Sequence, residues 1–279
     1  MTTGSFAAYC GLCLTQGAIV LLPRTVRPPW LDGLRAHWPL VVLPAAALTA
    51  VTFLPLVASA LASGLSSLAF FAVPLLAALG VGWAMRYHDW RLIPVIPALL
   101  AVAWAASSSP WGKGAGLALV ATSCVALAAV VAAVVPAVVA KTGIVAWAAA
   151  DLALAVAHHL EQASRAITEA TPALGPLAGL SLQHLQFQRV VLGSASMEYA
   201  DLFVAAVLGA VLAAESRNRG PASILVAVGA MSLTAFFLVT DVLPATVPVA
   251  VALGLEQLRS RRRIGQMSPL RLHGHSLGG

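Results

Sequence analysis

The sequence has few charged residues. Only 9% of its 279 residues are Asp, Glu, Lys or Arg, whereas 60% are hydrophobic, and the mean hydropathy is +0.90. A water-soluble core of this size does not need so much apolar surface, so the composition excludes a soluble fold and predicts an all-α polytopic membrane protein. Apolar runs of about twenty residues, long enough to span a bilayer as helices, recur almost end to end and exclude a large extramembrane domain.

Cysteine is also scarce, and the basic residues are dispersed. Cys10 and Cys13 form a CxxC pair, but no second pair or histidine lies near them, so we expect Cys10, Cys13 and Cys124 to be small core residues and predict no metal site. The basic residues lie in short loops and a tail, "RSRRR", without stacking aromatics. This pattern is typical of topology determinants and contacts with membrane lipids and argues against nucleic-acid binding. No basic segment precedes the first apolar run, so we expect no cleaved signal peptide.

Hydropathy predicts nine transmembrane helices. Their ranges are 5–23, 39–62, 65–85, 92–108, 114–140, 142–160, 194–214, 221–240 and 242–258, separated by turns rich in Pro, Gly, Ser and Arg. They form one predicted domain, 1–258, followed by a basic cytoplasmic tail, 259–279, that we expect to be disordered. The segment 161–193, between the sixth and seventh helices, is predicted to be an external loop along the membrane interface.

The loop charges support this count and orient the bundle. With the N-terminus outside and the C-terminus inside, thirteen basic residues fall inside: Arg24, Arg27, Arg35, Arg86, Arg91, Lys141, Arg217, Arg219, Arg259, Arg261, Arg262, Arg263 and Arg271. Lys113, Arg165 and Arg189 fall outside. Because cytoplasmic loops carry the excess of Lys and Arg, the sorting predicts an N-out, C-in orientation. The excess of arginine over lysine in an Ala-rich chain favours a bacterial or archaeal plasma membrane.

Two aspartates interrupt the predicted membrane helices. Asp151 lies about nine residues, or about 14 Å, below the outer end of the sixth helix, and Asp201 about seven residues, or about 11 Å, below the outer end of the antiparallel seventh. An ionised Asp deep in hydrocarbon costs at least about 2.5 kcal/mol, so such residues usually face a bundle interior or a watery cavity. Matched depth favours a shared role as an aspartic dyad, in which one carboxyl acts as base and the other as acid. The structural alternative is that each Asp bonds to a polar neighbour such as His158, Glu198 or Tyr199.

The neighbourhood of these aspartates resembles a known family. "ADLALAVAHHLEQASRAITEATPAL", "EYADLFVAAVLGA" and "VLPATVP" stand in the places of three motifs of the GxGD intramembrane aspartyl proteases, the presenilin and signal peptide peptidase group, and the orientation is that of the signal peptide peptidase branch. The resemblance implies a presenilin-like nine-helix bundle in which Asp151 and Asp201 are catalytic. It also implies that Pro244, Ala245 and Thr246 help to bind the substrate.

The chain departs from the family at all three motifs. Ala150 replaces Tyr before the first Asp, Glu198, Tyr199 and Ala200 replace Gly-Xaa-Gly before the second, and Thr246 replaces Leu. The resemblance implies an intramembrane aspartic endopeptidase that needs no cofactor and cleaves transmembrane segments or signal peptides.

The sequence also offers further candidate residues and alternative functions. Glu198, Tyr199 and Asp241 are candidate modulators of the dyad, while Asp241 is also placed to cap the ninth helix. "HHLE" lacks the one-turn spacing of the histidines of a zinc protease. The alternatives to a protease are a proton- or cation-coupled transporter or channel that uses the same aspartates, or a catalytically inactive family member that binds other membrane proteins.

Overall fold

The protein is mostly helical in its computed structural model, which describes residues 3–25, 31–39, 55–156, 187–192, 195–236 and 245–267. The helices are α1 (Thr3–Ile19), α2 (Asp32–Ala36), α4 (Pro55–Leu79), the π-helix η2 (Gly80–Ala84), the 3₁₀ helix η3 (Trp90–Leu92), α5 (Val95–Ala105), α6 (Pro110–Val134), α7 (Ala137–Val156), α9 (Tyr199–Ala214), α10 (Gly220–Phe236) and α11 (Val247–Met267). The described strands, β1 (Arg189–Leu192) and β2 (Ala195–Glu198), form an antiparallel pair that directly precedes α9 in the sequence.

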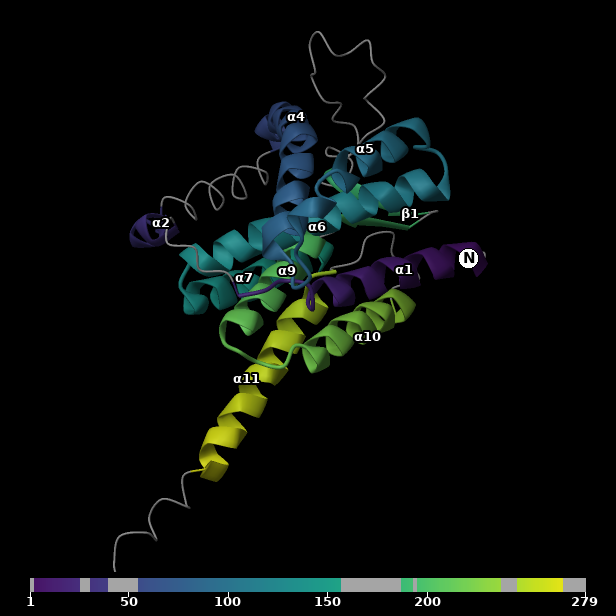
Figure 1. The fold of residues 1–279 in the computed structure, drawn as a ribbon. Coiled ribbons are helices and arrows are strands. Elements are labelled where there is room, and N and C mark those ends of the chain that lie inside the picture. The colour runs from purple at the N-terminus through teal and green to yellow at the C-terminus, as the bar shows by residue number, and fades with distance from the viewer. Residues whose placement is uncertain are drawn as a thin grey trace, which may run out of the picture.

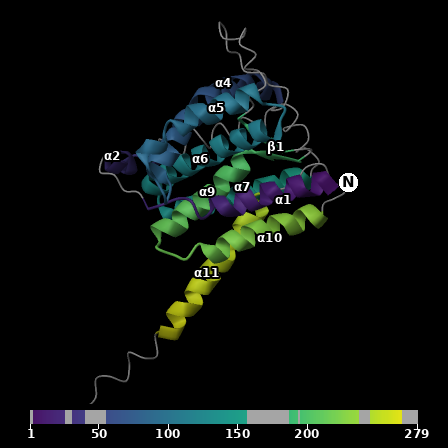
Figure 2. The same cartoon turned by 45° about the vertical axis from the view of Figure 1, so that its right-hand side comes forward.

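Helix α6 lies at the centre of the bundle. It packs against α4 and α5 on one side and against α9 on the other, while α1 and α10 lie side by side beyond α9 (Figure 1). Leu119, Cys124 and Val125 of α6 are fully buried, as are Leu208 and Leu212 of α9. The C-terminal part of α11 projects away from the bundle in a second view as well (Figure 2). The prediction of buried cysteines is confirmed for Cys13 and Cys124, whereas Cys10 is partly exposed.

Two helical stretches in the described parts are long and apolar enough to cross a membrane, Ser67–Ala84 and Pro110–Val134. Shorter apolar helices cover Ala7–Ile19, Trp90–Ala105, Tyr199–Ala214 and Gly220–Leu233. The helical class and the presence of apolar, membrane-length helices therefore agree with the sequence prediction.

The predicted boundary between the fifth and sixth helices is wrong. The break lies at Pro136 and not at Lys141, since α6 ends at Val134 and α7 begins at Ala137. Val135 has an extended backbone (φ −85°, ψ 135°), the conformation favoured before proline, and Pro136 has no N–H to continue the helix. At the other end, the Ser109 hydroxyl accepts from Gly112 N–H, which makes Ser109 the N-cap and starts α6 at Pro110 instead of 114.

The predicted break in "ASGLSS" is also wrong, because α4 continues through it as one helix. A single Gly in a helix costs only about 1 kcal/mol, whereas a break needs a stronger signal. Residues 40–54, most of the second predicted helix, lie outside the described residues.

Three further boundaries differ from the prediction. The seventh helix begins at Tyr199 and not at 194, because residues 195–198 form β2. Strand β1 occupies 189–192, within the predicted loop 161–193, most of which lies outside the described residues. Helix α11 continues to Met267, so the first part of the segment 259–279 is helical and not a disordered tail.

A close backbone contact joins α1 to α9. At Gly209, a Cβ atom would stand 2.3 Å from the backbone oxygen of Val20. Because the obstacle is backbone, it can be relieved only by moving one of the segments. The sequence therefore needs glycine here for packing, and not for an unusual backbone angle.

We expect Gly209→Ala to destabilise the protein by about 1–3 kcal/mol, the usual cost of overpacking a core. Thermal unfolding of purified protein in detergent measures the effect. Gly143→Ala in α7 is the matched control, since nothing lies within 4 Å of its Cβ position. That control should be neutral or slightly stabilising, because Ala favours helix. Equal melting temperatures for the two variants would contradict the proposed packing constraint.

Candidate functional site

Asp151 lies on α7 and is contacted there by the residues that immediately precede α11. The Thr246 hydroxyl donates to Asp151 Oδ2 at 2.5 Å, and the Thr246 backbone amide also faces this carboxyl. Thr246 is fully buried, whereas Asp151 is partly exposed. A hydrogen bond to a charged group stabilises by about 1.5–3 kcal/mol, so Thr246 fixes one oxygen of the carboxyl and leaves the other for further chemistry.

Asp201 lies in the first turn of α9, where its side chain caps the helix. Asp201 Oδ2 accepts from Glu198 N–H at 3.1 Å, and the Glu198 side chain accepts in return from the backbone N–H of Asp201. This reciprocal arrangement is a capping box, formed here by two acidic side chains. It explains why α9 begins where strand β2 ends.

The two aspartates face the same region of the bundle. Among the groups that act electrostatically on the Asp201 carboxyl are Asp151 and Glu198. Helices α7 and α9 also pack directly against each other. Asp151 and Asp201 therefore interact electrostatically from two helices that pack against each other.

Gln16 of α1 joins the two halves of this site. Its Nε2 donates to the Ala245 carbonyl at 2.8 Å and to the Asp201 carbonyl at 3.4 Å. Gln16 is fully buried, and its Oε1 is buried without a hydrogen-bond donor among the described residues. Because both neighbours are acceptors, the NH₂ group must face them. The Gln16 amide thus links the first turn of α9 to residues 245–246, the segment whose Thr246 side chain bonds Asp151.

Sequence reasoning missed Gln16 because it is uncharged and costs less to bury than an aspartate. The available signal was its place in the interior of the first apolar run, "CGLCLTQGAIVLL", where an amide needs a partner.

Tyr199 anchors the start of α9 to α6. Its hydroxyl lies 3.2 Å from Ser123 Oγ, and its carbonyl lies 3.7 Å from Cys124 Sγ. Ser123 is fully buried and also donates to the Val120 carbonyl of its own helix. Tyr199 therefore positions the turn that carries Asp201.

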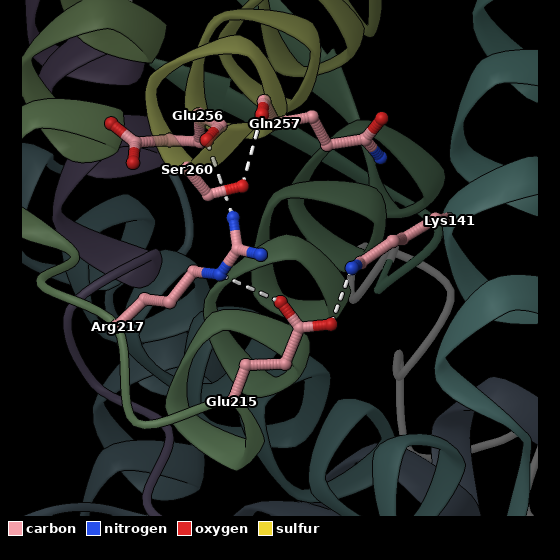
Figure 3. Close-up of polar contacts among 6 residues, drawn as sticks. All are labelled: Lys141, Glu215, Arg217, Glu256, Gln257 and Ser260. Carbon is pink, nitrogen blue, oxygen red and sulfur yellow. Dashed lines mark hydrogen bonds and ion pairs between the residues drawn. The ribbon is translucent and has the colours of Figure 1, made fainter. Parts of the chain in front are cut away.

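An ionic cluster joins α7, α9 and α11 at the ends of these helices that lie opposite to the aspartates (Figure 3). The Glu215 carboxylate at the end of α9 pairs with Lys141 of α7 and, at 2.9 Å, with Arg217 Nε. Arg217 Nη1 also donates to the Glu256 carbonyl of α11 at 3.2 Å. The side chains of Lys141, Glu215 and Arg217 are between 17% and 27% exposed, so the charges are only partly screened by solvent.

The spacing along each helix places the aspartates and the ionic cluster at opposite ends. Lys141 precedes Asp151 by ten residues, or about 15 Å of helix, and Glu215 follows Asp201 by fourteen residues, or about 21 Å. Glu256 follows Thr246 by ten residues, again about 15 Å. Helix α7 therefore runs antiparallel to α9 and α11.

Some of the remaining predicted site residues contact the aspartates or their helices, and others lie outside the described residues. Ala245 contacts the site through its carbonyl, and Thr246 bonds Asp151 itself. Glu198 caps the helix of Asp201. Pro244, Asp241 and His158 lie outside the described residues. No group of three or more His, Cys, Asp or Glu side chains that could hold a metal occurs in the described ranges.

A cavity of about 200 Å³ lies between α5, α6 and β1, and neither aspartate lines it. Its lining includes Lys113, Arg189, Phe187 and Gly116. Lys113 and Arg189, two of the three basic residues predicted to be outside, thus share one site, while Lys141 and Arg217 from the predicted inner set meet in the ionic cluster.

No protein-family model, no curated protein and no solved structure matches this chain.

We expect Gln16→Leu to lower the melting temperature, because it leaves the Ala245 and Asp201 carbonyls without their donor. Loss of a buried partner costs about 1–3 kcal/mol. Thr15→Val is the matched control, since the Thr15 hydroxyl donates only to Gly11 of its own helix in the described contacts. Thermal unfolding in detergent compares the two. A Gln16→Leu protein as stable as Thr15→Val would contradict the bridging role.

Proposed function

We propose that this protein is a multi-pass intramembrane aspartyl protease in which Asp151 and Asp201 hydrolyse a peptide bond of a transmembrane segment or signal peptide. The observation that carries the proposal is the convergence of the two aspartates from α7 and α9, with Thr246 bonded to Asp151 and Gln16 linking the Thr246 segment to the turn of Asp201. Polar groups are costly to bury in an apolar bundle, so several of them at one place indicate a function in addition to packing.

The proposed membrane placement is a nine-helix bundle, N-out and C-in. It is supported by the helices long and apolar enough to span a bilayer and by the meeting of predicted inner basic residues at one end. Asp151 and Asp201 lie toward the opposite, outer end. A substrate helix would reach them by partial unwinding near that surface, because peptide hydrolysis needs an accessible backbone carbonyl.

The chemistry needs one proton shared by the two carboxyls. The ionised carboxylate takes a proton from water as the water oxygen attacks the scissile carbonyl carbon, and the protonated carboxyl gives its proton to the carbonyl oxygen. Collapse of the resulting gem-diol breaks the C–N bond. The leaving nitrogen receives the proton that the first carboxyl accepted from water. The second carboxylate takes back a hydroxyl proton of the gem-diol as the product carboxyl group forms, which returns the pair to its singly protonated state. Thr246 and the Glu198 amide each hold one carboxyl oxygen during these steps.

A second candidate is a member of the same fold without catalysis, which binds other membrane proteins. The capping box favours it, because helix capping is a structural use of Asp201 that needs no reaction. Capping engages one carboxyl oxygen, so it is also compatible with the proposed dyad. Activity measurements separate the two candidates.

We expect Asp151→Asn and Asp201→Asn each to reduce cleavage of a fluorescent transmembrane peptide at least 100-fold, because general acid–base catalysis contributes about 10²–10⁴-fold. Asp89→Asn is the matched control: Asp89 caps η3 through Arg91 N–H, far along the chain from the dyad. It should retain wild-type activity.

Circular dichroism and thermal unfolding establish that all three variants are folded. No cleavage by the wild-type protein across a varied panel of transmembrane peptides, or full activity in either dyad variant, would refute the protease.

The Thr246 hydroxyl gives a finer test. Thr246→Val keeps the shape and removes the donor, so we expect kcat to fall about 10-fold or more, in line with about 1.5–3 kcal/mol for a hydrogen bond to a charged group. Thr246→Ser keeps the hydroxyl and should recover most of kcat. Steady-state kinetics on the same peptide separates kcat from KM. Equal activity of the Val and Ser variants would contradict the role of the hydroxyl.

A further inference from the structure

Three arginines from separate segments meet at one end of the bundle. Arg219 Nη1 donates to the Pro23 carbonyl, and the Arg86 guanidinium lies close enough to Arg219 to act on it electrostatically. Arg24 Nη1 lies 2.6 Å from His88 Nδ1, so this histidine accepts from the guanidinium and adds no compensating charge. We refer to Arg24, Arg86 and Arg219 as the arginine triad.

The backbone holds two of these arginines in place. Pro23 and Met85 form an antiparallel bridge, flanked by the bonds Arg24 N–H to Ala84 and Arg86 N–H to Leu22, at 3.0 and 2.8 Å. Arg24 and Arg86 are diagonal neighbours across this bridge, since Arg24 bonds Ala84 and Arg86 bonds Leu22. The bridge therefore fixes the backbone of the two arginines close together.

No carboxylate neutralises the triad among the described residues. Glu215 is engaged by Lys141 and Arg217, Glu256 by Arg259, and Asp89 caps η3. Arg24 Nε is buried and has no hydrogen-bond partner in the described parts. Burial and the nearby Arg86 charge lower the pKa of Arg219, as expected where like charges face each other without an acid. The positive charges of the triad therefore repel one another, and its guanidinium N–H groups can donate to an anion.

The surroundings of the triad are those of a membrane interface. Tyr87 is 79% exposed and Trp90 is 55% exposed, and Trp90 packs on Gly82, where a Cβ would stand 2.6 Å from its ring. Such aromatic side chains are enriched at the depth of lipid headgroups. Leu21 and Leu92, close in sequence to Arg24 and Trp90, are also exposed. Charged donors therefore lie next to apolar surface, which suits a ligand with an anionic head and acyl chains.

We propose that Arg24, Arg86 and Arg219 form a binding site for the phosphate of an anionic phospholipid headgroup. Guanidinium groups bind phosphate oxygens through paired N–H donors, and basic pockets between helices on the cytoplasmic side take anionic lipids. In the proposed orientation the triad lies on the cytoplasmic side. The site does not depend on catalysis by the aspartates, and its test uses no cleavage assay.

Native mass spectrometry of the full-length protein in neutral detergent tests the site. The probes are phosphatidylglycerol and phosphatidylcholine with identical acyl chains, with melting temperatures measured in parallel. We expect the wild type to retain phosphatidylglycerol preferentially and to melt at higher temperature with it. Arg86→Gln should weaken phosphatidylglycerol retention at least 5-fold.

The matched control is Arg91→Gln, which removes an exposed charge near the same end and should keep wild-type retention. Arg86→Lys keeps the charge without the fork of donors and should fall between wild type and Arg86→Gln, which separates binding from misfolding. Equal retention of the two lipids, or equal loss in Arg86→Gln and Arg91→Gln, would overturn the site. Inorganic phosphate that displaces the lipid and stabilises the protein as well as phosphatidylglycerol would overturn the lipid assignment in favour of a free anion.

Discussion

A polar group is costly to bury in an apolar bundle unless it is paired, and the hydrogen bond from Thr246 to Asp151 is the contact on which the candidate site depends. It attaches the start of α11 to the middle of α7. Gln16 extends the connection from α11 to the first turn of α9, through the carbonyls of Ala245 and Asp201. Because an unpaired buried polar group costs about 1–3 kcal/mol, these contacts specify one arrangement of four helices where apolar packing alone would allow several.

The far ends of three of these helices are fixed by charge. Glu215 accepts from Lys141 and Arg217, and Arg217 reaches Glu256, so α7, α9 and α11 are joined about 15–21 Å along the helices from the aspartates. Two polar clusters at opposite ends, with an apolar stretch between them, determine both the direction and the register of the helices.

The sequence was informative where a residue conflicted with its surroundings. Asp151 and Asp201 could be predicted as a pair because charge in an apolar run has few explanations. Gln16 could not, since an amide carries no charge and costs less to bury than an aspartate. Hydropathy also misplaced the break at Pro136, which is set by a missing N–H, and took 195–198 for helix, because a short apolar segment reads alike as strand or helix.

Two of the residues that depart from the motifs of the intramembrane aspartyl proteases contact the aspartates. Thr246, in the place of Leu, supplies a hydroxyl to Asp151, and Glu198, in the place of Gly, supplies a side chain that caps the helix of Asp201. A leucine offers no donor and a glycine no side-chain acceptor. Each of these two side chains therefore supplies a polar contact within the chain. The Thr246 hydroxyl and the Glu198 backbone amide each donate to the Oδ2 atom of an aspartate carboxyl, so these contacts are compatible with a second role for the other oxygen in the proposed dyad.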